Sequence, residues 1–300
     1  MRNPSRSSCY PVAMKNIQVP IQMNHPEAER RTVLFGSQMA LETNMGVVLT
    51  YYLDVNGSSN AVTRSLESAS AGYDPTELTR QREEFILNTL VEYQGLVLRT
   101  LYPSPPVSYM VISDTTADRK FLESGMEGIG LFLLCGDNLE THSFTWIHEI
   151  NSLILNNGRI PILVHNPGRE FSRLNRVVFG ISSGRLEEKD FRKLTGLFDP
   201  DRTEIIALFI TGEVDTDRLN RLTSQLEKIK SETGYRNMKM DTLVTREKLN
   251  AFNLSNSFAI DREADLIVCP GCNFKDGDDQ LHPEEVRRTA AKTEIPVMIY

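Results

Sequence analysis

The chain has 300 residues and a mass of 34.0 kDa, a length that fits two domains of about 100–200 residues each. Apolar residues make up 40% and charged residues 24%, which excludes a disordered, collagen-like or low-complexity chain. The formal net charge of -7 and the isoelectric point of about 5.4 give no overall attraction to nucleic acid or to anionic lipid.

Along the first half, short apolar runs alternate with segments of helical periodicity. Residues 17–21 and 47–53 are typical of strands buried on both faces. A helix between them is expected to begin at an Asn24 cap with Pro26 in its first turn, and a long exposed loop is expected from Asp54 to Asp74. The expected buried stripes of the helices are Ala28, Thr32, Phe35 and Met39; Ile86, Leu90 and Tyr93; and Trp146, Ile150 and Leu153.

The second half repeats this order. Residues 131–136 and 266–271 are similar apolar runs, and Ile160-Pro161 and Ile295-Pro296, 135 residues apart, each begin a further strand. Cys135 and Cys269 are 134 residues apart, so the two thiols are expected at corresponding strand ends. Residues 177–181 and 205–210 match the first two strands of the first half. The matching stripes are Phe191, Leu194 and Phe198; and Leu219, Leu222, Leu226 and Ile229.

This order of elements resembles the universal stress protein family, present twice in tandem. Residues 14–21 look like that family's opening strand, and residues 39–49 look like its first helix and second strand. Residues 264–268 and 295–299 are similar to its fourth and fifth strands. The resemblance implies an α/β fold of two tandem Rossmann-like (adenine nucleotide alpha hydrolase-like) domains. Each would be a five-stranded parallel sheet with helices on both faces.

The expected domains are residues 14–166 and 172–300, both universal stress protein-like, with a disordered extension at residues 1–13. Turn-forming residues Asn166–Arg169 mark the linker. Such domains commonly pair through their fifth, edge strands, so residues 160–165 and 295–300 are the predicted contact of an internal pseudo-dimer. Association of two chains into a homodimer is left open.

The resemblance also implies where a nucleotide would bind. Some members of the family bind ATP beyond the carboxyl ends of the strands, through an acidic residue after the first strand and a glycine-rich loop after the fourth. Here Gln22 and Ser182 take the acidic places, and the spaced glycines are missing after Gly136 and Gly271. Because phosphate needs closely approaching backbone N–H groups, often at positive φ, their loss disfavours ATP and AMP. We expect no cofactor and no metal.

Two segments at this edge could carry chemistry of another kind. Ser182, Ser183 and Arg185 could hold an anion, although a helix capped by serine is the simpler interpretation. Together with Gln22, Gly136 and Gly271 they are the candidate ligand-binding residues. The five histidines are interpreted as surface or capping residues: His25, His142, His148, His165 and His282.

Cys269-Pro270-Gly271-Cys272 has the spacing of a redox pair or of half a zinc site. The pair closes a strand and precedes an acidic loop, whereas a reactive thiol needs a helix amino terminus or a nearby cation. Small structural residues, redox-sensitive thiols and a metal site all remain open for Cys269 and Cys272. Cys135 is expected to be a buried small residue.

The protein is expected to be cytoplasmic. Four cysteines fit a reducing compartment, no apolar run approaches the roughly 20 residues of a membrane helix, and the first residues lead into no signal core. No catalytic triad or pair of carboxylates is evident, so an enzyme is not expected. The leading hypothesis is a stress-response protein that acts through protein contacts or a small ligand other than ATP. The alternatives are an ATP- or AMP-binding regulator and a thiol-based redox sensor.

Overall fold

A computed structural model describes residues 15–23, 25–53, 75–113, 128–136, 160–181, 197–245, 251–269 and 292–299. The strands are β1 (Asn16–Ile21), β2 (Gly46–Leu53), β3 (Val107–Ser113), β4 (Ile129–Cys135), β5 (Ile162–His165), β6 (Arg176–Ile181), β7 (Glu204–Thr211), β8 (Met238–Val244), β9 (Leu266–Cys269) and β10 (Val297–Ile299). The helices are α1 (Pro26–Thr43), α3 (Pro75–Thr100), α8 (Thr216–Thr233) and α9 (Ala251–Asp261).

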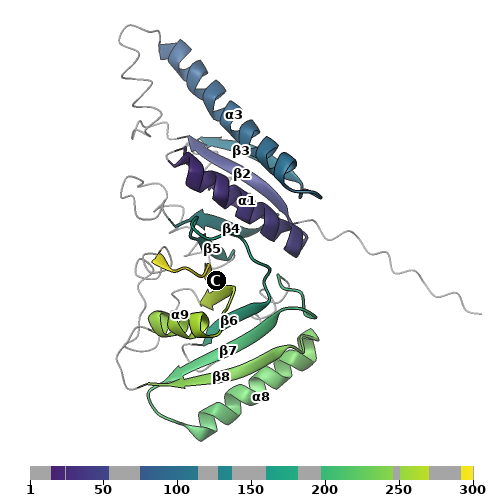
Figure 1. Cartoon of the computed structure of the whole chain (residues 1–300), viewed down its shortest axis with the longest axis vertical. Coiled ribbons are helices and arrows are strands. Elements are labelled where there is room, and N and C mark those ends of the chain that lie inside the picture. The colour runs from purple at the N-terminus through teal and green to yellow at the C-terminus, as the bar shows by residue number, and fades with distance from the viewer. Residues whose placement is uncertain are drawn as a thin grey trace, which may run out of the picture.

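These strands form one sheet in the order β3-β2-β1-β4-β5-β10-β9-β6-β7-β8. Each half has the same internal order, with its first strand at the centre and its fifth strand at the join, and every pair within a half is parallel. Figure 1 shows the sheet running along the length of the molecule, with α3 at one end and α8 at the other. The predicted α/β class, with a duplicated five-stranded parallel unit, is confirmed.

The two halves join through β5 and β10, which pair antiparallel. Leu163 lies opposite Met298, and Val164 lies opposite Val297. The prolines that precede both strands accept ladder hydrogen bonds through their carbonyls, from Phe132 N–H to Pro161 O and from Ile267 N–H to Pro296 O, each 3.0 Å. The predicted contact is therefore confirmed for residues 162–164 and 297–299, and it makes the sheet continuous.

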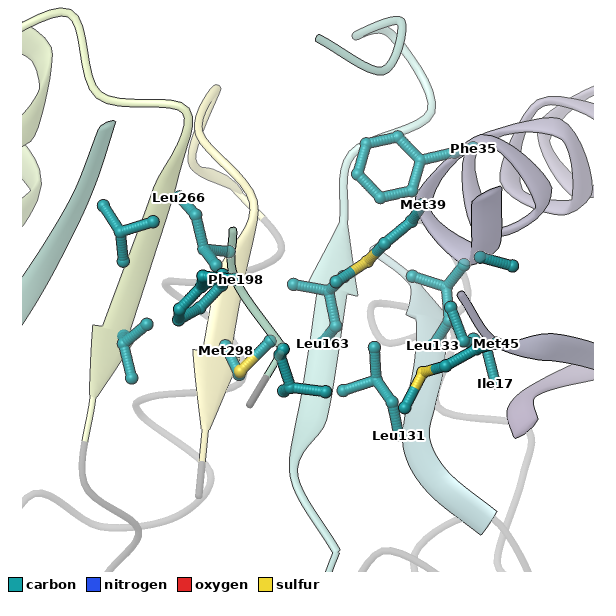
Figure 2. Packing of buried hydrophobic residues seen from close by; sticks show 14 of the residues in the cluster. Ile17, Phe35, Met39, Met45, Leu131, Leu133, Leu163, Phe198, Leu266 and Met298 are labelled. Atoms are coloured by element: carbon teal, nitrogen blue, oxygen red, sulfur yellow. The ribbon is translucent and has the colours of Figure 1, made fainter. Parts of the chain in front are cut away.

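Apolar side chains cover both faces of the sheet. On one face α1, α3 and α8 pack over a single cluster that crosses the join through Leu163 and Met298. Figure 2 shows Phe35 and Met39 pointing from α1 toward Leu163, with Met298 next to Phe198 in the other half. On the opposite face, α9 packs on a second cluster through Phe258 and Ala259. In the second half α8 and α9 thus lie on opposite faces, as the sequence predicted, whereas the described helices of the first half, α1 and α3, lie on the same face.

The N-cap of α1 is His25, whose side chain makes no capping hydrogen bond, so the predicted Asn24 cap is wrong. Asn24 itself lies outside the described residues. Phe198 is buried in the turn before β7 rather than on a helix. The expected loop at 54–74, the stripe at 146–153 and Phe191 with Leu194 also lie outside the described residues.

Candidate functional site at the carboxyl edge of the first half

A buried carboxylate occupies the junction between β1 and α1. Glu29, in the first turn of α1, is only 1% exposed. Its Oε1 accepts the backbone N–H of Gln22 at 3.0 Å, and its Oε2 accepts the hydroxyl of Tyr93 on α3 at 3.0 Å. The amino end of a helix favours negative charge because its N–H groups are unpaired. Here the protein places its own carboxylate at that position.

Tyr93 is the second member of this cluster, and burial is the largest reason that its pKa lies above the usual range. The nearby charge of Glu29 raises the pKa further. The phenol therefore keeps its proton and remains a hydrogen-bond donor to the carboxylate. The sequence had predicted only a packing role for Tyr93, and its ring does belong to the core.

Gln22 lies at the end of β1, where the sequence predicted a ligand contact. Its backbone N–H is already bonded to Glu29, and the next residue, Met23, turns the chain with a φ of 62°. The Gln22 side chain is 4% exposed, and within the described part of the chain its Oε1 has no hydrogen-bond partner. A buried acceptor without a donor costs about 1–3 kcal/mol, so a ligand that supplies an N–H or O–H group would be favoured there.

Gly136 follows β4, and its backbone N–H was the other predicted contact in this half. That N–H donates to the carbonyl of His165 at 2.7 Å. The bond continues the parallel pairing of β4 with β5, in which Cys135 lies opposite His165. A phosphate at this edge would have to compete with that carbonyl for the Gly136 N–H.

His165 ends β5 and is fully buried, so the prediction of a surface or capping role is wrong for this residue. Its ring stacks on Phe35 of α1 with the centroids 3.9 Å apart. Burial, reinforced by the charge of Arg169, lowers the pKa of His165 to about 3. Neither ring nitrogen has a hydrogen-bond partner among the residues described. The imidazole is therefore neutral at pH 7 and serves as an aromatic packing group.

The two strand-end cysteines do not occupy equivalent positions. Ile17 lies opposite Leu131 in the first half, whereas the matching Val177 lies opposite Leu266 in the second. The structural offset between β4 and β9 is therefore 135 residues, and the counterpart of Cys135 is position 270. The prediction of corresponding thiols, which rested on a separation of 134, is wrong by one residue.

A shift of one residue moves a side chain to the other face of a sheet. Cys135 lies two residues beyond Leu133 in β4, so it is on the same face as Leu131 and Leu133, which face α1. Cys269 belongs instead to the cluster on the opposite face, beside Ile267. It is 6% exposed, and burial raises the pKa of its thiol to about 12. Cys269 is thus protonated at neutral pH and poorly suited to nucleophilic or redox chemistry.

The remaining candidates lie outside the described residues: Ser182, Ser183, Arg185, Gly271, Cys272, His142, His148 and His282. Among the residues that are described, no group of three or more metal-binding side chains occurs. The same residues contain no helix that is long and apolar enough to cross a membrane. His25, the N-cap of α1, is exposed, as predicted.

Glu29 and His165 were missed as members of the site, although each leaves a signal in the sequence. Glu29 is three and four residues from the buried Thr32 and Val33, which puts a charged residue on the inner face of an amphipathic helix. His165 directly continues the apolar run 162–164. A polar residue in line with buried ones needs a partner or a stacking neighbour, and that requirement marks both positions.

Comparison with known proteins shows the fold. A universal stress protein from Archaeoglobus fulgidus DSM 4304 superposes with a TM-score of 0.53 and 9% identity, over 95% of each chain. A putative universal stress protein from Pseudomonas aeruginosa UCBPP-PA14 gives a TM-score of 0.47 and 13% identity, over 96% of this chain and 93% of that one. A functionally unknown protein from Pseudomonas aeruginosa PAO1 gives 0.46 and 13%, over 96% and 92%. No family model and no curated protein matches the sequence.

Proposed function

We propose that this protein is a non-enzymatic stress-response protein of the universal stress type, which acts through protein contacts or a small ligand other than ATP. The fold likeness supports the class. The observation that carries the rest is that two backbone N–H groups at the carboxyl edge of the first half are already bonded: Gln22 N–H donates to Glu29, and Gly136 N–H donates to the His165 carbonyl.

Electrostatics at this edge supports the same conclusion. A polyphosphate is bound through backbone N–H groups and the positive end of a helix. Glu29 already occupies that end of α1, buried and doubly hydrogen-bonded. A second anion about 4 Å from it would cost on the order of 1 kcal/mol even in water, and more in a partly buried site. A neutral ligand that donates a hydrogen bond to Gln22 Oε1 meets no such repulsion.

A thiol-based sensor is a weaker explanation. Thiols that respond to oxidants are exposed and have lowered pKa values. Cys269 is buried on the face covered by α9, and its pKa is raised to about 12. It is therefore a poor partner for Cys272 in reversible disulfide chemistry.

Thermal unfolding with 1 mM MgATP or AMP tests the proposal. A nucleotide with a Kd of about 10 μM would stabilise the folded protein by about 2.7 kcal/mol at that concentration. We expect no rise in the unfolding temperature and no ATP hydrolysis. A saturable rise, or nucleotide retained by the purified protein in native mass spectrometry, would contradict the ATP-independent function. The same spectra identify any neutral compound that co-purifies.

A further inference from the structure

The ten-stranded sheet ends in two strands of different character. Among the described strands, β3 and β8 each have a strand neighbour on one side only. β8 carries Lys239 and Asp241, which are bonded to Glu204 and Arg262. β3 has the sequence Val-Ser-Tyr-Met-Val-Ile-Ser, without charge or proline. Charged residues on an edge strand prevent it from pairing with another chain, and β3 lacks this protection.

The outward-facing backbone groups of β3 can be assigned. Val47 N–H of β2 donates to Pro106 O at 2.8 Å, so the groups of residues 106, 108, 110 and 112 face β2. The N–H and C=O groups of Val107, Tyr109 and Val111 therefore face away from the sheet. The Val107 carbonyl accepts a hydrogen bond from Nε2 of Gln94 on α3 at 2.7 Å. The groups of Tyr109 and Val111 face outward, in the position that an added strand would take.

From Leu87 onward, the flank of α3 beside this edge is apolar and exposed. Leu87, Val91 and Leu98 are 44%, 48% and 56% exposed. The other flank faces α1, because Glu92 pairs with Arg30 at 2.7 Å. At about 100° per residue, the three apolar side chains lie roughly 100–140° around the helix from Glu92. They are on the same side as Gln94, over the open side of β3.

Tyr109 and Val111 extend this apolar surface onto the strand itself. They are 39% and 41% exposed and lie on the same face of β3 as Val107, which packs against the core beneath α3. Among the described residues, one surface therefore combines a strand edge whose backbone groups face outward with an apolar stretch of helix, which follows the exposed Arg80–Glu84 ion pair on the same face of α3. An occupant must supply an uncharged edge strand together with an apolar helix flank on the same face.

We infer that this surface, formed by β3 and the Leu87–Val91–Leu98 flank of α3, pairs with the same surface of a second copy of the chain, about a two-fold axis through Met110. The chain itself is an occupant that meets both requirements. It already uses the same type of contact at its centre, where β5 and β10 pair antiparallel edge to edge. A two-fold axis perpendicular to the sheet keeps both copies of α3 on one face.

The register follows from the outward groups. With Met110 on the axis, Tyr109 of one copy lies opposite Val111 of the other, and each of these two pairs exchanges two N–H···O=C bonds. Both pairs join an aromatic to a β-branched side chain, a combination that stabilises antiparallel strands. This register leaves the bond between Gln94 and Val107 intact.

The expected distance between the two copies of α3 also fits this arrangement. Strands lie about 4.8 Å apart, and α3 contacts both β2 and β3. A helix centred between these two strands is about 4.8 Å from the proposed axis. The two copies of α3 would then be about 10 Å apart, within the range of about 8–10 Å at which helices pack.

Sedimentation of the full chain tests the surface. The expected mass at micromolar concentration is twice 34.0 kDa, falling to 34.0 kDa in the Val111→Lys variant. Val244→Lys is the matched control, because Val244 is 47% exposed on the opposite edge strand, and this variant should remain dimeric. A monomeric wild type, or a Val111→Lys protein as dimeric as wild type, would overturn the inference.

Disulfide cross-linking tests the register independently of any effect on folding. Directly opposed residues of a non-hydrogen-bonded antiparallel pair have Cα atoms about 4.5 Å apart, which suits a disulfide. Met110→Cys should therefore cross-link two chains in mild oxidant, well above the wild-type background. The control Ser108→Cys places its thiols about four residues apart across the axis, so it should cross-link at least tenfold more slowly. Equal rates for the two variants would overturn the inference.

Discussion

The two halves of the sheet share one strand order but place their acidic groups differently. In the first half Glu29 is buried, and it is bonded to Gln22 N–H and the Tyr93 hydroxyl. In the second half Glu204 lies at the amino end of β7 and accepts hydrogen bonds from Lys239 at 2.6 Å and Arg176 at 2.8 Å. The Lys239 hydrogen bond is the main reason that the pKa of Glu204 is lowered. Glu29 thus binds buried donors at the carboxyl edge of the first half, whereas Glu204 links β6, β7 and β8 through partly exposed side chains at the amino edge of the second.

The largest difference in stability between the two halves is expected when their carboxylates are removed. Glu29→Ala should lower the free energy of unfolding by about 3 kcal/mol, because it leaves the Gln22 N–H and the Tyr93 hydroxyl buried without an acceptor. Glu204→Ala should cost about 1 kcal/mol or less, since its cationic partners are partly exposed to water. Denaturant unfolding measures both.

Glu29→Gln is the matched variant for size. It keeps one acceptor oxygen but loses the charge, so its loss of unfolding free energy should lie between zero and that of Glu29→Ala. Equal costs for Glu29→Ala and Glu204→Ala would mean that burial does not distinguish the two carboxylates.

The next difference is a dependence of stability on pH that comes from His165, in the first half. The pKa of His165 is about 3 in the folded protein, against about 6.5 in an unfolded chain. Between these values the unfolded state binds more protons, so stability falls as the pH falls from 6.5 toward 3, by up to about 1.4 kcal/mol per pH unit. His165→Leu should flatten this part of the stability profile. A His165→Leu profile as steep as wild type would rule out the neutral, buried imidazole.

The smallest difference is expected between two buried tyrosines. Tyr93 donates to the Glu29 carboxylate, and Tyr235 donates to the Thr203 carbonyl at 2.8 Å. Hydrogen bonds to charged groups are worth about 1.5–3 kcal/mol and neutral ones about 1 kcal/mol. Tyr93→Phe should therefore destabilise the protein by about 1 kcal/mol more than Tyr235→Phe in the same denaturant experiment. The reverse order would contradict a charged acceptor in the first half.

Most of the fold could be predicted from the sequence because the apolar runs and their duplication are strong signals. The Ile-Pro pairs at 160 and 295 marked the two strands that join the halves, since proline is tolerated at a strand start. The Asn24 cap failed because the sequence offers His25 directly before Pro26, and the helix begins at the proline.

The candidate site was less predictable because it depends on register and on contacts between distant residues. Gln22 and Gly136 were correctly placed at strand ends, but the partners of their N–H groups could not be seen in the sequence. Glu29 and Tyr93 are 64 residues apart. The two cysteines show how strongly the assignment of a strand residue depends on register. An error of one residue placed Cys135 and Cys269 at equivalent positions, although they lie on opposite faces of the sheet.

The central claim is that the backbone groups which a nucleotide would need are already bonded within the protein. Amide NMR of the full chain tests it directly, by following the Gln22 and Gly136 N–H signals during a titration with MgATP. We predict that both amides are protected from hydrogen exchange and that neither signal shifts at millimolar nucleotide. Rapid exchange of these two amides, or saturable shifts at both, would contradict the account.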